Sequence, residues 1–321
     1  MPGDNTLYGP TVQPDTYGRG DDNFENFIDN WRHYQDRLIV FLGAGASMGA
    51  KCQAGNSLPT AIGLRDDLWA EFMLTEQERA APPKLGLLSL EHSSALIEAK
   101  VGRGPLVEYV GRRFRMNQPL WPHAALPFFN PKAIYTTNYD ELVELGWQRH
   151  TNLPRICPVF SPSQSSIGSG WTPLYKPHGT AQHAAGAVGE GGIVLTQFDY
   201  FSMLEKKRDM LRSFLENMRS NCVVFIGYSF QDMDIASMLH SMRNQGRERH
   251  WYAVFPRADA NVRSMYDRQY GIRQISRTFV DFVAEAGTRL GLIPTGWEPN
   301  LPLAPSDASL SRNSFQVIDF P

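Results

Sequence analysis

Apolar positions along the chain gather in short continuous runs that are separated by helical patterns. The clearest run is LIVFL at residues 38–42. Similar runs follow at AIYTTN, ICPVF, IVLT, CVVFIG and WYAVFP (residues 133–138, 156–160, 193–196, 222–227 and 251–256), with a weaker one at PLYK (173–176). Such runs are typical of parallel strands that are covered on both faces. The alternation of strands and helices predicts an α/β fold, an open and mostly parallel Rossmann-like sheet.

Three regions depart from this alternation. Residues 62–118 have helical periodicity and no strand signal, which predicts a helical insert sub-domain between the first two strands. Residues 1–22 are rich in Gly, Pro and Asp and are expected to form a flexible N-terminal arm. The main α/β domain then spans residues 23–291. The remainder, 292–321, is a Pro/Ser-rich tail ending in the apolar piece FQVIDF, which we expect to contact a partner or another copy of the chain.

Composition narrows the class of protein. The 321 residues are 42% hydrophobic and 20% charged, and 31 basic against 33 acidic residues give a net charge of −2. This balance offers no electrostatic footprint for nucleic acid or an anionic membrane. The N-terminus lacks the features of a signal peptide, and no apolar run approaches the ~20 residues that span a bilayer. Three separated cysteines without a C-x-x-C pair argue against disulfides and a local zinc module. We therefore expect a cytoplasmic protein without a metal.

The first apolar run leads directly into a glycine-rich loop, GAGAS at residues 43–47. Glycines let a backbone approach a diphosphate closely, and a helix start offers free N–H groups to its oxygens. The loop is not a Walker A motif, because Cys52 follows Lys51 where Ser or Thr is required. It is not a complete dinucleotide fingerprint either, because Met48 stands where the third glycine belongs. Alone, the loop fits a tight turn without a ligand equally well.

Three further polar motifs each follow a predicted strand. Any one of them is more often an ordinary turn or cap. In an open parallel sheet, however, ligands bind beyond the carboxyl ends of the strands. The glycine loop and the three further motifs, each at the end of a strand, therefore predict one shared crevice. The motifs are YTTNYDE with Thr137, Asn138 and Asp140, YKPHGT with His178 and Gly179, and FIGYSFQDMD with Gly227, Ser229 and Phe230.

In this order the motifs resemble those of the sirtuin superfamily, which binds NAD and breaks its nicotinamide–ribose bond. GAGAS matches the family's G-A-G-x-S loop, and TTNYD resembles T-Q-N-x-D with Thr137 in place of Gln. HG at 178–179 matches the catalytic His-Gly, GYS at 227–229 resembles G-T-S, and SLPT at 57–60 stands where the flexible cofactor loop would lie. The resemblance covers roughly residues 38–256.

The departures from the family indicate a subgroup. Protein-deacylating sirtuins carry two C-x-x-C pairs after the histidine, and here no cysteine separates Gly179 from the next apolar run. The D-F-R of the cofactor loop is missing as well. The chain is more similar to the divergent bacterial sirtuin-like domains of anti-phage defence, which hydrolyse NAD outright. The resemblance thus implies a sirtuin-like NAD-binding domain in which the helical insert replaces the zinc-bearing sub-domain.

The resemblance also implies roles for individual residues. Asn138 and His178 would be catalytic. The asparagine holds a ribose hydroxyl or the attacking water, and the histidine acts as a general base, a role that suits this residue type because its unperturbed pKa of ~6.5 lies near working pH. Asp140 would accept a hydrogen bond from the nicotinamide carboxamide. No metal is required, because the leaving group is already a cationic pyridinium. The expected NAD-binding residues are Gly43, Ala44, Gly45, Ser47, Pro59, Thr60, Thr137, Asp140, Gly227, Ser229 and Phe230.

Three functions remain open from the sequence. The first is NAD hydrolysis, with NAD as substrate, by the effector of an abortive-infection system. The second is NAD-dependent deacylation or ADP-ribosyl transfer, and the missing zinc cysteines count against deacylation. The third is a non-catalytic nucleotide-binding scaffold, against which the pair Asn138 and His178 counts. By family analogy we expect a homo-oligomer that is activated in trans by a DNA-translocating ATPase or a short Argonaute.

Overall fold

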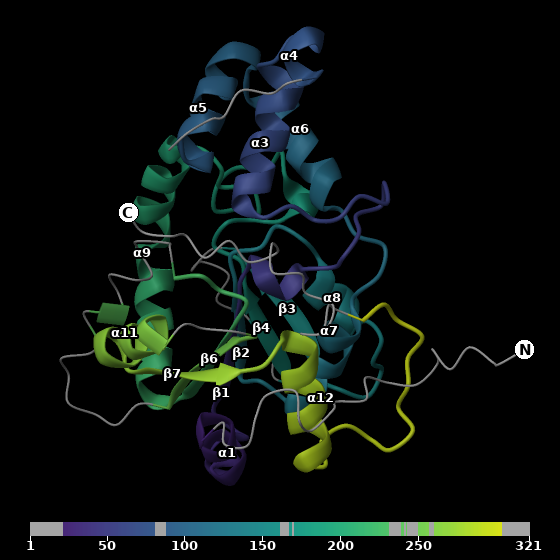
Figure 1. Cartoon of the computed structure of the whole chain (residues 1–321), viewed down its shortest axis with the longest axis vertical. Coiled ribbons are helices and arrows are strands. Elements are labelled where there is room, and N and C mark those ends of the chain that lie inside the picture. Colours follow the sequence, from purple (N-terminus) through teal and green to yellow (C-terminus); the bar gives the residue numbers. More distant parts are fainter. Residues whose placement is uncertain are drawn as a thin grey trace, which may run out of the picture.

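A seven-stranded sheet forms the centre of the computed structural model (Figure 1). The structure describes residues 22–80, 88–160, 167–168, 170–230, 239–240, 242, 250–256 and 260–303. The strand order is β3-β4-β2-β1-β5-β6-β7, and every strand pair in it is parallel. The predicted open sheet is therefore confirmed, and it is parallel throughout rather than mostly. The strands are β1 (Leu38–Leu42), β2 (Ala133–Thr136), β3 (Arg155–Val159), β4 (Trp171–Tyr175), β5 (Cys222–Ile226), β6 (Trp251–Phe255) and β7 (Ile272–Ser276).

Helices and short 3-10 turns connect the strands. The first two described elements are α1 (Asp22–Asp29) and α2 (Trp31–Tyr34), and the apolar spacing of the sequence predicts a helix there. The other elements are η1 (Ala44–Ser47), α3 (Ala61–Phe72), α4 (Glu76–Ala80), α5 (Leu90–Val101), α6 (Arg103–Phe114), α7 (Trp121–Ala125), η2 (Leu126–Phe129), α8 (Leu142–Trp147), η3 (Ala181–His183), α9 (Gln197–Ser220), α11 (Ala260–Tyr270) and α12 (Phe279–Arg289).

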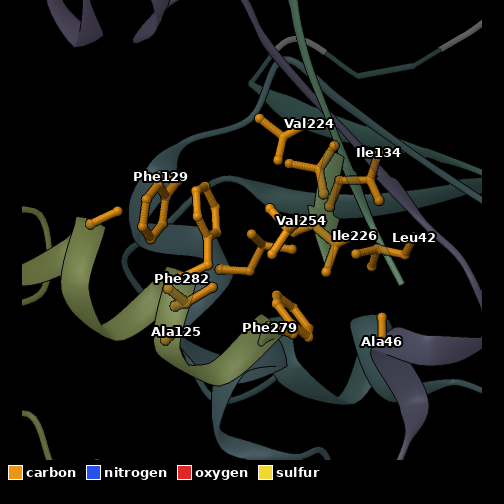
Figure 2. Close-up of a cluster of buried hydrophobic side chains, with 14 of the residues drawn as sticks. Leu42, Ala46, Ala125, Phe129, Ile134, Val224, Ile226, Val254, Phe279 and Phe282 are labelled. Atoms are coloured by element: carbon orange, nitrogen blue, oxygen red, sulfur yellow. The ribbon is translucent and has the colours of Figure 1, made fainter. Parts of the chain in front are cut away.

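Both faces of the sheet are covered at its centre, which explains why the central strands β1 and β5 are continuously apolar. In β1, Leu38, Val40 and Leu42 point into one core, and Ile39 and Phe41 point into the other. The first core is closed by α1, α2, α7, α8 and α12, and part of it is drawn in Figure 2. The second core is closed by α9 and α11. The strands β1, β2 and β5 therefore bury every side chain, and they need no polar–apolar alternation.

Four of the described helices between β1 and β2, α3–α6, form what we call the helical module. In Figure 1 the module stands beyond one end of the strands. Its core is formed by residues such as Leu68, Ile97 and Val110, and the same cluster includes Tyr139 and Ala181 from loops at the carboxyl edge of the sheet. The module therefore packs directly on the strand tips.

The structure corrects the sequence-based assignment in two places. Residues 193–196 are not a strand. Ile193 and Leu195 are completely buried, but they pack against the helical module instead of pairing with a strand. The sequence reading also missed β7 and α12, since β7 is IRQIS, with polar residues between its apolar ones.

Parts of two predictions lie outside the described residues. Almost the whole expected N-terminal arm falls at positions 1–21, and FQVIDF falls within positions 304–321. Within the described part of the chain, no helix has the length and apolar character needed to cross a membrane.

Candidate active site

The four polar motifs follow four strands that are consecutive neighbours in the sheet. β4, β2, β1 and β5 lie side by side and run in the same direction. Their carboxyl ends therefore meet at one edge, and the loops that carry Asn138, His178, the GAGAS loop and Gly227 all begin there. The chain order reverses on the two sides of β1, and such switch points are where open α/β sheets bind ligands.

The glycine loop is held by backbone contacts across the switch point. Gly43 N donates to Ile226 O at 2.9 Å, and Gly45 N donates to Gly227 O at 2.9 Å. A Cβ on Gly45 would lie 2.8 Å from Gly227 Cα. A Cβ on Gly227, whose φ is +61°, would lie 2.2 Å from Ala46 N. The glycines of two separate motifs are therefore required for the loops after β1 and β5 to touch.

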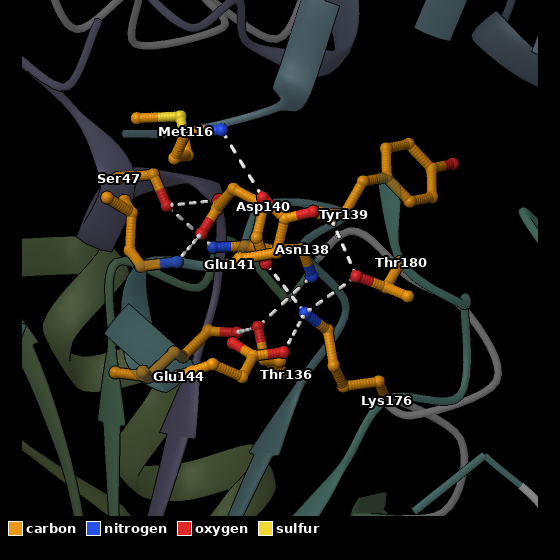
Figure 3. Close-up of polar contacts among 12 residues, drawn as sticks. Ser47, Met116, Thr136, Asn138, Tyr139, Asp140, Glu141, Glu144, Lys176 and Thr180 are labelled. Atoms are coloured by element: carbon orange, nitrogen blue, oxygen red, sulfur yellow. Dashed lines mark hydrogen bonds and ion pairs between the residues drawn. The ribbon is translucent and has the colours of Figure 1, made fainter. Parts of the chain in front are cut away.

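Asn138 is fixed against the glycine loop by its side-chain amide (Figure 3). Its Nδ2 donates to Gly43 O at 2.9 Å and to Ser47 Oγ at 3.0 Å. Its backbone N donates to Thr136 Oγ1 at 3.1 Å, and that hydroxyl donates to Leu42 O. With both amide protons engaged, the carbonyl oxygen is the end of the Asn138 side chain that remains to be presented to a ligand.

Asp140 is hydrogen-bonded to the same group of residues through Ser47. Ser47 Oγ donates to its Oδ2 at 2.7 Å, and Leu142 N, at the start of α8, donates to its Oδ1 at 3.1 Å. Burial raises the pKa of the Asp140 carboxyl, while nearby Lys176 and these hydrogen bonds oppose that rise. In this arrangement both carboxyl oxygens and the Ser47 hydroxyl have a structural task, which is to orient Asn138.

His178 is held by a different set of contacts. The turn that carries it is closed by Gly179 N donating to Lys176 O at 3.1 Å, and a Cβ on Gly179 would lie 2.2 Å from Gly192 O. Val194 N donates to His178 O at 3.0 Å. The buried imidazole packs edge-to-face against the Tyr200 ring, with 5.2 Å between ring centroids. The apolar stretch at 193–196 thus supports the histidine loop.

Several expected NAD-binding residues have other contacts. Thr60 caps α3, with its Oγ1 accepting from Gly63 N at 3.2 Å, and Pro59 precedes it. Ser229 is exposed and its carbonyl accepts from Tyr266. Phe230, at φ +57°, packs into an aromatic group with Phe225, Tyr228, Tyr266 and others. Their roles toward NAD stay predictions, as do those of the half-buried Thr137 and the exposed Ala44.

Sequence reasoning missed the residue that joins the two loops. Lys176 is fully buried, and its Nζ donates to Asp140 O, Glu144 Oε1 and Thr180 Oγ1. Ala181 N also donates to Tyr139 O, at 2.7 Å. The available signal was a lysine placed directly after an apolar strand and two residues before the histidine, in the motif YKPHGT.

This edge of the sheet defines a Rossmann-like domain with its candidate site at the switch point. The model of the SIR2-like domain family matches residues 132–275, a range that contains the Asn138, His178 and Gly227 motifs and begins after the glycine loop. This match, over less than half of the chain, supports a divergent sirtuin-like domain. No curated protein matches the chain.

Two solved Sir2 structures are similar to the chain. One comes from work on the mechanism and regulation of Sir2 enzymes: it is 12% identical, with a TM-score of 0.50, over 85% of this chain and 99% of that one. The other is a mutant Sir2 homologue in complex with ADP-ribose, at 13% identity and a TM-score of 0.47, over 83% and 99%. The first likeness concerns the fold alone. Among the described residues, no group of three or more His, Cys, Asp or Glu side chains is arranged to hold a metal.

Proposed function

We propose that this chain is an NAD hydrolase that cleaves the nicotinamide–ribose bond. The observation that carries the proposal is the orientation of Asn138. Gly43 O and Ser47 Oγ take both protons of its amide, beside a glycine loop that suits a diphosphate. Its Oδ1 would accept a hydrogen bond from a ribose hydroxyl or from water at the reacting carbon. The sirtuin-like family supports NAD as the substrate.

The reaction that we propose balances without a cofactor. The bond between ribose C1′ and the pyridinium nitrogen breaks, and its electron pair leaves with neutral nicotinamide. Water forms the new bond to C1′, giving ADP-ribose. His178 takes the proton that water loses, and its place on the neighbouring strand tip supports this role as general base. Asn138 fixes the water or the ribose, because an acceptor whose amide is tied at its other end cannot rotate away.

The proposed biological role follows from the resemblance to bacterial defence domains. We propose that the chain is the effector of an abortive-infection system that depletes cellular NAD. In this role it acts as a homo-oligomer in the cytoplasm and is switched on by a partner protein such as a DNA-translocating ATPase or a short Argonaute.

The test is nicotinamide release from NAD by the purified chain, alone and with the protein encoded beside it. Asn138→Ala and His178→Ala should each lower the rate by about 100-fold or more. The controls Asn152→Ala and His92→Ala change the same residue types at exposed positions and should keep the wild-type rate. Thermal melting checks that each variant is folded.

Three results would contradict the proposal. A wild-type chain that binds NAD and releases no nicotinamide under either condition would be a scaffold. Nicotinamide release that depends on an acetyl-lysine peptide would identify a deacylase. Transfer of labelled ADP-ribose to protein would identify a transferase.

A further inference from the structure

Lys176 is the last residue before the turn that carries His178, and its side chain is completely buried. A charged ammonium group in the interior is costly unless acceptors surround it. Here Nζ donates to Asp140 O at 2.6 Å, to Glu144 Oε1 at 2.8 Å and to Thr180 Oγ1 at 3.3 Å. All three protons of the ammonium group therefore have a partner.

The three acceptors come from different segments. Asp140 belongs to the loop that carries Asn138, Thr180 belongs to the loop that carries His178, and Glu144 on α8 supplies the balancing charge. Thr180 Oγ1 also donates to Tyr139 O, at 3.4 Å. Figure 3 shows the lysine between these groups. One side chain thus connects the two loops after β2 and β4.

We propose that Lys176 is a positioning residue that holds the Asn138 loop and the His178 loop in register for NAD cleavage. This inference rests on the proposed function. Lys176 acts through the backbone of Asp140 and the hydroxyl of Thr180. Stability alone does not require the charge, because well-packed apolar residues commonly replace buried ion pairs at no loss of stability. Lys176 Nζ, however, donates both to the Asp140 carbonyl and to the Thr180 hydroxyl, and an apolar side chain at this position would not link them.

The principal variant is the double substitution Lys176→Met with Glu144→Leu. It removes both charges together, so that no unpaired carboxylate is left buried. A milder variant, Thr180→Val, keeps the shape and removes one acceptor. The matched control is Lys132→Met, at an exposed lysine just before the opposite end of β2.

Two measurements on the full chain separate positioning from folding. The first is amide hydrogen exchange, which needs no NAD. Residues 137–142 and 178–183 should exchange at least tenfold faster in the double variant and at the wild-type rate in Lys132→Met. The second is steady-state NAD cleavage. The double variant should lose about 100-fold in kcat and Thr180→Val about tenfold, with KM within threefold of wild type, since a lost alignment acts on the transition state.

The outcomes are distinct. Unchanged amide exchange in both loops of the folded double variant overturns the inference, regardless of its rate of NAD cleavage. Faster exchange with kcat within threefold of wild type overturns the positioning role. A wild type without NAD cleavage contradicts the proposed function instead, and exchange then still decides whether Lys176 joins the loops. If the double variant does not fold, Thr180→Val is judged by the same two measurements.

Discussion

The two halves of the candidate site are built differently. The glycine half, around Gly43, Gly227 and Asn138, is held by contacts between neighbouring strand ends, chiefly backbone against backbone. The histidine half, around His178, is held by the stretch at 193–196 and by the Tyr200 ring. The first half is part of the sheet, whereas the second depends on groups outside it.

Those outside groups lead to the helical module. Arg103, at the start of α6, donates to Ile193 O and to Asp199 Oδ2, both at 2.7 Å, and forms an ion pair with Glu98 at 3.1 Å. Asp199 in turn accepts from the backbone N of Leu195 and of Thr196. A shift of α6 would therefore reach the histidine half through Arg103 and Asp199. The comparison suggests a glycine half that is fixed by the sheet and a histidine half that can be adjusted through the helical module.

The largest effect is expected from breaking the glycine half. Gly227→Ala places a Cβ against the backbone of the neighbouring loop and strains a φ of +61°. We expect the free energy of unfolding to fall by about 3 kcal/mol or more, measured by urea denaturation. Under the proposed function, ADP-ribose binding should be lost as well. Gly55→Ala is the control, because its φ is +83° with nothing within 4 Å, and strain alone should cost about 1 kcal/mol. Equal losses in the two variants would contradict the close-contact explanation.

A second experiment compares two buried histidines. His123 lies in the core that supports the glycine half, and His178 belongs to the histidine half. Burial lowers the pKa of His123 to about 3, against 6.5 in the unfolded chain. Below pH 6.5 the unfolded chain gains a proton that the folded chain does not, so stability falls by about 1.4 kcal/mol per pH unit down to about pH 3. Near pH 5 the loss is about 2 kcal/mol.

Urea titrations between pH 7.5 and pH 5 measure this slope. His123→Leu should flatten the dependence of the free energy of unfolding on pH, since leucine has no proton to gain. His178→Ala should leave the part of this dependence that is due to His123 unchanged. A His123→Leu slope equal to that of the wild type would show that His123 does not stay neutral in the folded chain.

The smallest effect on stability is expected from loosening the histidine half. Arg103→Met removes the link between α6 and residues 193–199. Its side chain is 31% exposed, so we expect only about 1 kcal/mol of lost stability. Under the proposed function, kcat should fall about tenfold, while ADP-ribose affinity, measured by calorimetry, stays within threefold. Arg65→Met, on α3 of the same module, should change neither kcat nor the affinity for ADP-ribose. Equal weakening of binding and turnover would mean that the two halves move together.

Those features of the fold that depend on local patterns of apolar residues could be predicted from the sequence. Continuous apolar runs identified β1, β2, β3, β5 and β6, and the parallel fold then required their polar tips to meet at one edge. The same rule failed for residues 193–196, because an apolar run reports burial and not strand pairing. It also passed over β7, whose polar residues interrupt the apolar pattern.

Within the site, motif spacing predicted which residues follow the strand ends but not how they bond. Ser47 was expected to bind NAD, and only the structure revealed that its hydroxyl joins Asn138 to Asp140. Lys176 was missed for a similar reason. A lysine is ordinarily exposed, and its burial depends on acceptors from residues 140, 144 and 180, which only the folded chain assembles.

The position of β1 in the middle of the sheet has a consequence for synthesis of the protein. Leu38 pairs with Cys222, so the ribosome must complete most of the chain before β1 gains its second neighbour. At roughly 5–20 residues per second, this takes on the order of ten seconds or more. Meanwhile one edge of LIVFL is an open template for misplaced strands, which makes the nascent chain a candidate for chaperone binding. Gly45 also has no Gly227 to contact until then, so a chain truncated before β5 cannot complete the contacts of the glycine loop.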